Sequence, residues 1–239
     1  MKLSICIPMY NEAACAADTA AKLKEAARAL VDSGAISDFE IIFSDDGSVD
    51  GCYDLVPEGD GIVKIRSEKN TGKGGAVRRA VAASTGDAVL YTDCDLAYGT
   101  DVIGEAVRQY ASQGVTVLVG SRAKHPEGYE GYTFVRRVAS KAYLLFLRVF
   151  AGFGLSDSQC GFKLFEGECA RRVFSLCECD GWAFDFEALM IAKKTGASFG
   201  ELPVKIINHG ESRINVVSDS VKMLRELAKI KKRVKKLEV

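Results

Sequence analysis

Short apolar runs alternate with longer amphipathic stretches through the first half of the chain. The runs are rich in Ile, Val, Leu and Phe, which predicts β-strands. The longer stretches combine Ala, Leu, Lys, Glu and Arg with apolar residues at helical spacing, which predicts α-helices. The pattern predicts strands over residues 3–7, 39–43, 62–66, 88–92 and 116–119, and helices over residues 13–33, 74–84 and 101–113.

Regular alternation of strands and helices predicts a mostly parallel sheet with helices on both faces. Ile41, Ile42 and Phe43 are apolar at successive positions, as expected for a strand that is covered on both faces. We therefore predict an α/β fold, a single-domain α/β/α sandwich with a mostly parallel central sheet. Ligands of such sheets lie beyond the carboxyl ends of the strands, so the polar residues that follow each strand form the candidate site.

Composition narrows the class of protein. The chain has 239 residues, 48% of them hydrophobic, with 32 basic and 32 acidic side chains. This length supports one globular domain, and the balanced charge argues against nucleic acid as a partner. Eight cysteines without a CxxC pair indicate reduced thiols, and two histidines are too few for a histidine-rich zinc site. No apolar run has the length of a membrane span, and no signal peptide is expected, which predicts a cytoplasmic protein.

The first candidate group follows the strand at residues 3–7. Pro8 is expected to end that strand, which places Tyr10 and Glu12 at the rim of the site. The alternative is a plain strand exit, in which Glu12 is favoured by the dipole of the helix that follows.

The second group, residues 44–50, follows the next strand and reads SDDGSVD. The carboxylate of Asp46 can accept the imide N–H of a uracil or the ring N–H of a guanine, and this contact does not separate the two bases. The alternative is a tight turn that uses Asp and Gly for backbone reasons.

The third group, residues 69–75, is a glycine-rich loop that opens a helix. Its free backbone N–H groups and Lys73 can meet a diphosphate. The loop lacks the spacing and the final Ser or Thr of a P-loop, which excludes that motif. A helix-starting turn with a solvated lysine is the alternative.

The fourth group is Asp93-Cys94-Asp95, directly after the apolar strand at residues 88–92. We expect an extended segment, in which both carboxylates point the same way and share a divalent cation with a diphosphate. Two ionised carboxylates at this place repel each other unless a cation or another partner is present.

These groups occur in the order IPMYNE, SDDGSVDG, NTGKGGAVRRA, DCDLAY and VGSR, which resembles family 2 glycosyltransferases. In the second half, SDSQCGFKLF, GWAFDFEALMIA, ELPV and GESR resemble the polyprenyl-phosphate branch, and most of all dolichyl-phosphate β-glucosyltransferases. The resemblance implies a fold of the glycosyltransferase A type and an inverting transfer of one hexose to a polyprenyl phosphate. It favours glucose from UDP-glucose over mannose from GDP-mannose, with Mg²⁺ or Mn²⁺ as the cofactor.

The resemblance also implies roles for residues. Nucleotide-sugar contacts fall on Pro8, Tyr10, Glu12, Ser44, Asp46, Lys73, Asp93, Cys94, Asp95 and Arg122, and the metal falls on Asp93 and Asp95. Acceptor-phosphate contacts fall on Arg136, Gln159, Lys163 and Arg213, and Arg213 stands where relatives usually carry lysine. Catalytic roles fall on Asp95, Asp157, Asp185 and Arg122. A surface salt bridge is the alternative for Arg122 and Arg136.

The acceptor decides whether a general base is needed. A polyprenyl phosphate is largely dianionic at neutral pH and is already nucleophilic. A sugar hydroxyl of a glycolipid or polysaccharide precursor is the alternative acceptor, and it requires a carboxylate such as Asp185 or Glu187 to take the proton. Asp185 can instead cap a helix over residues 186–194. A non-catalytic module that binds a nucleotide sugar is disfavoured, because it has no leaving group for the aspartates to stabilise.

Two segments are candidates for peripheral contact with the cytoplasmic face of a membrane. Residues 134–153 predict an apolar helix interrupted by Arg148, and residues 218–237 predict an amphipathic helix with a basic run from Lys229 to Lys236. A core helix, a solvated helix end or a homo-oligomer interface explains the same patterns. We expect a catalytic domain at residues 1–217, with a donor half at 1–122 and an acceptor half at 123–217, and a basic helix at 218–239.

Overall fold

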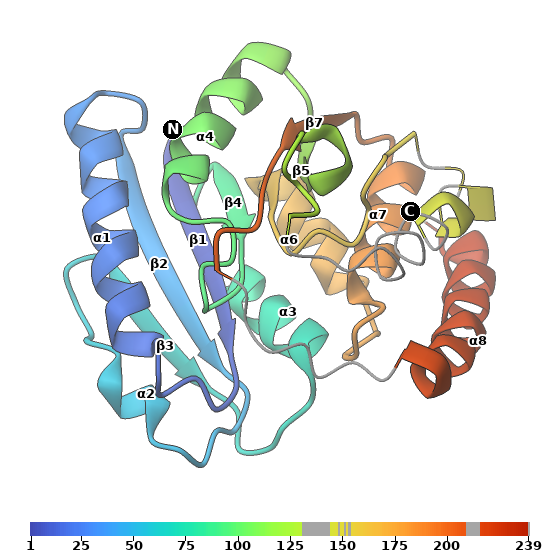
Figure 1. Cartoon of the computed structure of the whole chain (residues 1–239), viewed down its shortest axis with the longest axis horizontal. Coiled ribbons are helices and arrows are strands. Elements are labelled where there is room, and N and C mark those ends of the chain that lie inside the picture. Colours follow the sequence, from blue (N-terminus) through green and yellow to red (C-terminus); the bar gives the residue numbers. More distant parts are fainter. Residues whose placement is uncertain (131–143, 148, 151, 153, 209–215, 239) are drawn as a thin grey trace.

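A computed structural model of the chain describes residues 1–130, 144–147, 149–150, 152, 154–208 and 216–238. Seven strands form one sheet in the order β3-β2-β1-β4-β6-β5-β7 (Figure 1). β6 pairs antiparallel with both β4 and β5, whereas the other pairs of strands are parallel. The strands are β1 (Lys2–Met9), β2 (Asp38–Asp45), β3 (Ile62–Arg66), β4 (Ala88–Tyr91), β5 (Val117–Ser121), β6 (Lys163–Glu166) and β7 (Phe199–Pro203). The mostly parallel sheet predicted from the sequence is confirmed.

Helices cover both faces of this sheet (Figure 1). Ile5 and Ile41 belong to the apolar core that the sheet shares with α1 and α4. Their neighbours Cys6 and Ile42 belong to the opposite core, which includes α3, α6 and α7. Both faces of the strands are therefore buried, which explains their apolar residues at successive positions. The helices are α1 (Ala16–Asp32), α2 (Cys52–Leu55), α3 (Lys73–Ala83), α4 (Asp101–Gln113), α6 (Gly167–Ser175), α7 (Phe184–Lys194) and α8 (Val216–Lys236), with a short 3-10 helix, η1 (Arg122–Lys124).

Most predicted elements are found, but β1 is longer than predicted. β3 and α4 have the predicted ends. β1 continues through Pro8 to Met9, so the expectation that proline ends this strand is wrong. β4 accompanies β1 only as far as Cys6, whose carbonyl accepts the Thr92 N–H. The backbone nitrogen of Pro8 faces the same side, beyond the end of the β4 pairing, so the N–H that proline lacks has no strand to bond.

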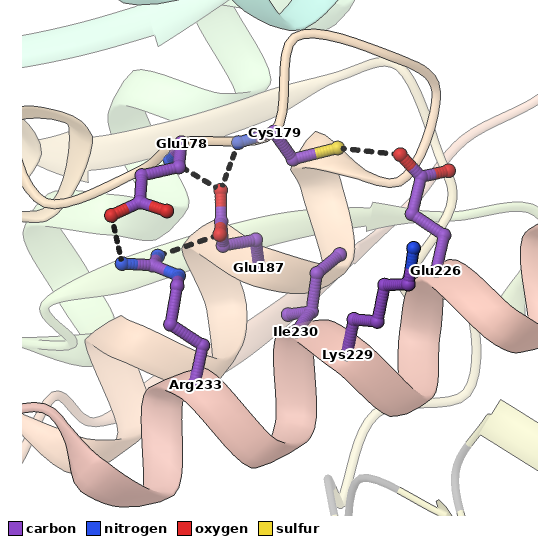
Figure 2. A pocket seen from close by; sticks show the side chains of 7 residues that line it. All are labelled: Glu178, Cys179, Glu187, Glu226, Lys229, Ile230 and Arg233. Carbon is purple, nitrogen blue, oxygen red and sulfur yellow. Dashed lines mark hydrogen bonds and ion pairs between the residues drawn. The ribbon is translucent and has the colours of Figure 1, made fainter.

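α8 packs on the outside of the second helix layer. Its residues Leu227, Ile230 and Val234 are buried in the core that contains α7. Arg233 reaches the carboxylate of Glu187 at the start of α7 (Figure 2). In the part of the chain that the structure describes, no helix is both long enough and apolar enough to cross a bilayer. The helix predicted at residues 134–153 falls mostly outside the described residues, and helix is present at 144–147 and 149–150.

Candidate active site

The carboxyl ends of the parallel strands meet at one edge of the sheet. β1, β2 and β4 bring Tyr10, Asp46 and Asp93 to this edge. Because β6 runs antiparallel, its first residue, Lys163, lies at the same edge, opposite Tyr91 at the end of β4. The sequence predicts the first three positions from the strand ends, but it gives no local signal for the position of β6.

The segment after β1 is held by the turn after β2. Asn11 has a left-handed φ of 54°, and its backbone N–H donates to the hydroxyl of Ser48 at 2.9 Å. Tyr10 is 42% exposed at the rim of the site. α1 begins at Ala16, and the carbonyl of Glu12 accepts the backbone N–H groups of Cys15 and Ala16 in the turn that leads into this helix.

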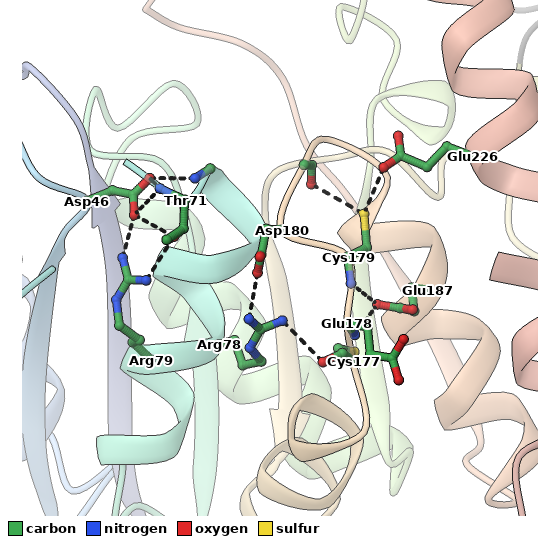
Figure 3. A network of polar contacts seen from close by, with 12 residues as sticks. Asp46, Thr71, Arg78, Arg79, Cys177, Glu178, Cys179, Asp180, Glu187 and Glu226 are labelled. Carbon is green, nitrogen blue, oxygen red and sulfur yellow. Dashed lines mark hydrogen bonds and ion pairs between the residues drawn. The ribbon is translucent and has the colours of Figure 1, made fainter. Parts of the chain in front are cut away.

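Asp46 is buried and holds the loop that opens α3 (Figure 3). Its carboxylate accepts the backbone N–H groups of Thr71 and Gly72 at 3.0 and 2.6 Å, and it forms an ion pair with Arg79 at 2.6 Å. Burial alone raises the pKa of Asp46, but the hydrogen bonds from Thr71, Arg79 and Gly72 outweigh burial and hold the pKa below its ordinary value. A contact between Asp46 and a base would therefore require one of these donors to be exchanged.

The start of α3 packs against the loop that precedes α7. Gly72 has a φ of 107°, and a Cβ atom there would collide with the backbone oxygen of Asp180. The Gly74 N–H donates to the same oxygen at 2.8 Å. These close approaches require glycine at both positions, which explains part of the glycine-rich pattern in the sequence.

Lys73 is the first residue of α3 and points toward the aspartate pair. Its ammonium forms an ion pair with Asp93. Burial alone lowers the pKa of Lys73, but the carboxylates of Asp93, Asp185 and Asp95 outweigh burial and raise the pKa above its ordinary value. Lys73 is therefore a protonated lysine that faces the end of β4, and the alternative of a solvated lysine is wrong.

The chain turns at the aspartate pair, and the extended segment predicted there is wrong. The backbone N–H of Leu96 donates to the carbonyl of Asp93 at 3.1 Å, and Leu96 has a left-handed φ of 48°. The turn allows Leu96 to enter the core. Cys94 is buried as well, whereas Asp93 is partly exposed and Asp95 is exposed. Although Asp95 reaches solvent, partial desolvation of its carboxyl by the surrounding protein and the charge of Asp93 raise its pKa, and the second cause is the repulsion expected of two neighbouring carboxylates.

The aspartate pair has the ligand chemistry of a hard divalent cation. Carboxylate oxygens suit Mg²⁺ and Mn²⁺, and the repulsion between Asp93 and Asp95 would be relieved by such an ion. Among the described residues, no group of three or more His, Cys, Asp or Glu side chains is arranged to hold a metal. The two carboxylates can therefore supply part of a coordination shell, with the remainder coming from substrate oxygens or water.

Arg122 and Asp157 form a buried ion pair. Nε and Nη2 of Arg122 donate to the two carboxylate oxygens of Asp157 at 2.7 and 2.9 Å. Asp157 is fully buried, so a surface salt bridge is the wrong description of Arg122. Burial alone lowers the pKa of Arg122, but Asp157 raises it well above the ordinary value. Arg136 and Arg213 lie outside the described residues.

Asp185 belongs to a buried cluster next to the end of β4. The N-cap of α7 is Ala183, so the expectation that Asp185 caps this helix is wrong. The Asp185 carboxylate accepts the hydroxyl of Tyr91 and the ammonium of Lys163, the latter at 2.6 Å. Lys163 is fully buried and also donates to the carbonyl of Cys160 at 2.5 Å. A contact between Lys163 and an acceptor phosphate would therefore require this cluster to open.

Glu187 and Gln159 differ in how they are partnered. Glu187 lies in the first turn of α7, and its carboxylate is buried. It accepts the backbone N–H groups of Glu178 and Cys179 at 2.9 and 2.7 Å and the guanidinium of Arg233 at 2.6 Å. Gln159, in contrast, has a buried Nε2 atom without a hydrogen-bond partner. Its amide is an unused donor within the acceptor half.

A groove of about 270 Å³ lies between α8 and the loop before α7 (Figure 2). Asp93 and Asp95 are not among its lining residues. The candidate active site is therefore located by the strand ends and their polar side chains, and this groove is a separate feature. Its lining residues are Glu178, Cys179, Glu187, Glu226, Lys229, Ile230 and Arg233.

Comparison with known families decides the family of this chain. The family described as Glycosyl transferase family 2 matches residues 4–174, which include the aspartate pair and Lys73. The chain belongs to glycosyl transferase family 2.

Individual proteins resemble this family 2 glycosyltransferase over most of its length. A dolichyl-phosphate beta-glucosyltransferase from Dictyostelium discoideum is 29% identical over 96% of this chain and 73% of the relative. Glycosyltransferase AglD from Haloferax volcanii is 31% identical over 93% of this chain, but over only 36% of the relative. A crystal structure of glucosyl-3-phosphoglycerate synthase from Mycobacterium tuberculosis, in complex with Mn²⁺, UDP and glucosyl-3-phosphoglycerate, matches with a TM-score of 0.69 at 19% identity. That match covers 98% of this chain and 79% of the other. The predicted glycosyltransferase A fold is confirmed.

Four residues of this glycosyltransferase site were not singled out from the sequence. Arg79, Tyr91 and Asp180 make contacts with residues far away in the chain, so no local pattern marks them. Trp182 is different, because it is the only tryptophan and lies within the motif GWAFDFE. It is 64% exposed, and its ring centre lies 5.5 Å from the ammonium of Lys73. An exposed aromatic residue inside a motif was the available signal.

Proposed function

We propose that this family 2 glycosyltransferase transfers one hexose, glucose, from UDP-glucose to a polyprenyl phosphate with inversion at the sugar C1. The observation that carries the proposal is the open pair of Asp93 and Asp95 at the end of β4, with Lys73 facing it from the start of α3. Two carboxylates and an ammonium at one strand end suit a metal-bound diphosphate. Similarity to dolichyl-phosphate beta-glucosyltransferases supports the acceptor class and the sugar.

The diphosphate of the donor is assigned to the space between β4 and α3. Asp93 and Asp95 would hold Mg²⁺ or Mn²⁺, which when bound neutralises charge on the departing diphosphate. Lys73 would contact the same diphosphate, and its ion pair with Asp93 already directs it there. Arg122 uses Nε and Nη2 for Asp157, which leaves Nη1 for a phosphate oxygen.

The nucleoside is assigned to the rim formed by the ends of β1 and β2, against Pro8 and Tyr10. The exposed ring of Tyr10 offers a surface for a base. The hydroxyl of Ser44 is buried without a hydrogen-bond partner and is available as a donor or acceptor. Asp46 enters the proposal as the residue that anchors the loop on which Lys73 stands.

The two candidate bases are already paired with cations, which favours a phosphate acceptor over a hydroxyl acceptor. A hydroxyl acceptor needs a carboxylate that is free to take its proton. The carboxylate of Asp185 is engaged by Lys163, and that of Glu187 by Arg233. A phosphate dianion needs no base. Gln159, with its unused amide donor, is assigned to the acceptor phosphate.

We assign a peripheral position at the cytoplasmic face of a membrane. Leu145, Phe146 and Val149 expose apolar side chains, and Lys231 of α8 lies 4.2 Å from the ring centre of Phe150. Apolar side chains beside a basic helix end suit a surface of anionic lipid, where each cation contributes about 1 kcal/mol.

Flotation with vesicles of anionic phospholipid tests this contact. We expect Val149→Asp to reduce the fraction of protein that floats. Val49→Asp is the matched control, because Val49 is also exposed but lies on the turn after β2. Equal flotation of both variants and the wild type would contradict the assigned surface.

Transfer of labelled sugar tests the reaction. We expect UDP-glucose, with Mg²⁺ or Mn²⁺, to label a short polyprenyl phosphate in detergent, and GDP-mannose in parallel to label it less. Hydrolysis of the donor without labelling of the lipid would overturn the acceptor, and preference for GDP-mannose would overturn the donor.

A further inference from the structure

The proposed function makes no use of Lys163, although this lysine is fully buried close to the aspartate pair. Removing an ammonium from water carries a large desolvation cost, which a buried ion pair offsets only in part. Lys163 opens β6 and lies opposite Tyr91 of β4. Tyr91 is itself enclosed by the rings of Phe165, Phe174 and Phe184. An ion pair in such an apolar environment is poor evidence for stability and suggests another role.

The cluster around Asp185 is fixed from two strands. The Lys163 ammonium lies 2.6 Å from Oδ1 of Asp185, and the Tyr91 hydroxyl donates to the same oxygen. The ammonium also lies 5.5 Å from the centre of the Tyr91 ring. Both donors approach one carboxylate oxygen, so Lys163 and Tyr91 fix the orientation of the carboxylate.

Asp185 is also close to Lys73. A Cβ atom at Gly74 would collide with the Cβ of Phe184, so the first turn of α3 packs directly on the first turn of α7. Asp185 also accepts the hydroxyl of Tyr91, which lies two residues before the Asp93 that pairs with Lys73. Lys73 therefore pairs with the partly exposed Asp93 and stands at the start of a helix that packs on the helix carrying the buried Asp185.

Lys73 and Lys163 could each pair with Asp93 or Asp185, and the pairing found in the structure leaves Lys73 at the donor site. Lys163 occupies Asp185, and Lys73 remains with Asp93 at the donor site. If Asp185 lost Lys163, it would be a buried carboxylate without its cation, and Lys73, on the neighbouring helix start, could replace that cation. Lys73 would then be drawn inward, away from the diphosphate.

We propose that Lys163 is a positioning residue of the donor site, which occupies Asp185 and so keeps Lys73 directed toward the donor diphosphate. Tyr91 assists by fixing the same carboxylate. The inference rests on the proposed function only for the diphosphate that Lys73 meets, and it holds for either acceptor.

Binding of UDP in the presence of Mn²⁺, measured by calorimetry without any acceptor, tests this role. We expect Lys163→Met to weaken UDP binding about tenfold, the size expected for loss of one charge-assisted hydrogen bond. The double variant Lys163→Met/Asp185→Asn removes the carboxylate that would capture Lys73. We expect it to recover to within about threefold of the wild type, because Lys73 is again free to meet the diphosphate.

A destabilised control separates positioning from stability. Phe174→Leu loosens the packing around Tyr91 without changing any charge. We expect it to lower the thermal midpoint and to leave UDP affinity near that of the wild type. Equal loss of affinity in Phe174→Leu and Lys163→Met at matched midpoints would overturn the proposal, and so would a double variant that binds as weakly as Lys163→Met.

A replacement variant and a second nucleotide complete the experiment. If Lys163→Met does not fold, Tyr91→Phe replaces it, and we expect a smaller loss of UDP affinity that Asp185→Asn again reverses. GDP is measured in parallel with UDP. If the wild type binds GDP and not UDP, the UDP-glucose donor is overturned, and the affinities of the variants are then compared with GDP. If the wild type binds neither nucleotide, the inference itself is overturned.

Discussion

The carboxylates at the end of β4 and the buried carboxylates of Asp157 and Asp185 are partnered in opposite ways. Asp93 and Asp95 are open to solvent, repel each other and have Lys73 as the nearby cation. Asp157 and Asp185 are buried, and each is tied to one cation of its own. The open pair is poorly satisfied by the protein alone, whereas each buried carboxylate is already satisfied.

Under the proposed function, this difference separates the groups that bind ligand from the groups that position them. An open pair of like charges gains stability when a cation binds, so its side chains are available for function at some cost to the folded state. A buried ion pair loses heavily when one partner is removed, so its side chains keep other groups in place. Substitutions at the open pair should therefore lower activity more than stability, and substitutions at a buried pair should have a large effect on stability.

The largest effect on activity is expected at the open pair. Asp95→Ala should lower the rate of sugar transfer about 100-fold or more, because charge on the leaving diphosphate would no longer be neutralised. Asp101→Ala is the matched control, since Asp101 is an exposed aspartate at the start of α4. Initial rates at saturating metal measure the effect, and similar rates for the two variants would remove the distinction between the two kinds of carboxylate.

The largest effect on stability is expected at a buried pair. Asp157→Asn should lower the free energy of unfolding by about 3 kcal/mol, because it leaves the guanidinium of Arg122 buried without its counter-charge. Asp95→Asn should leave the thermal midpoint unchanged or raise it, because one of two repelling charges is lost. Denaturant titrations of both variants measure this, and a larger loss for Asp95→Asn would reverse the comparison.

Asp46 sharpens the comparison, because it lies at the same edge of the sheet as Asp93 but is partnered like the buried carboxylates. Asp46→Asn should lower the free energy of unfolding by about 2 kcal/mol at neutral pH, since hydrogen bonds to a charged group are lost. The pKa of Asp46 is lowered by folding, so its contribution is complete above the unfolded pKa of about 4 and is lost as the pH falls through the folded value. The difference between wild type and variant should therefore shrink below about pH 4 in acid unfolding curves. A constant difference across this range would show that charge is not the cause.

The fold could be predicted from local patterns wherever an element is long or is bounded by clear breakers. The helix at Asp101–Gln113 has regular apolar spacing and ends before Gly114, whose φ is 60°. β6 could not be predicted in the same way, because its position between β4 and β5 depends on pairing between residues far apart in the chain. The short α2 was missed for a related reason, since one turn of helix has almost no periodicity.

The positions of the site residues in the fold were predicted more accurately than the contacts that their side chains make. The polar residues after the strands do gather at one edge, because parallel strands require it. The turn at Asp93 was missed, because it depends on burial of Leu96 in the core. The pairing of Lys163 with Asp185 was missed, because a lysine in a strand gives no sign of its partner on a helix. The domain boundaries at residues 122 and 217 stay predictions.

The most direct test of the open pair as a metal site is the binding of Mn²⁺, followed by the electron paramagnetic resonance signal of free Mn²⁺ with and without UDP. We predict that UDP strengthens Mn²⁺ binding in the wild type and in Asp101→Ala, and that Asp95→Ala abolishes this effect. Two results would contradict the assignment of metal and diphosphate to the end of β4. One is that UDP still strengthens Mn²⁺ binding in Asp95→Ala, and the other is that UDP does not change Mn²⁺ binding in the wild type.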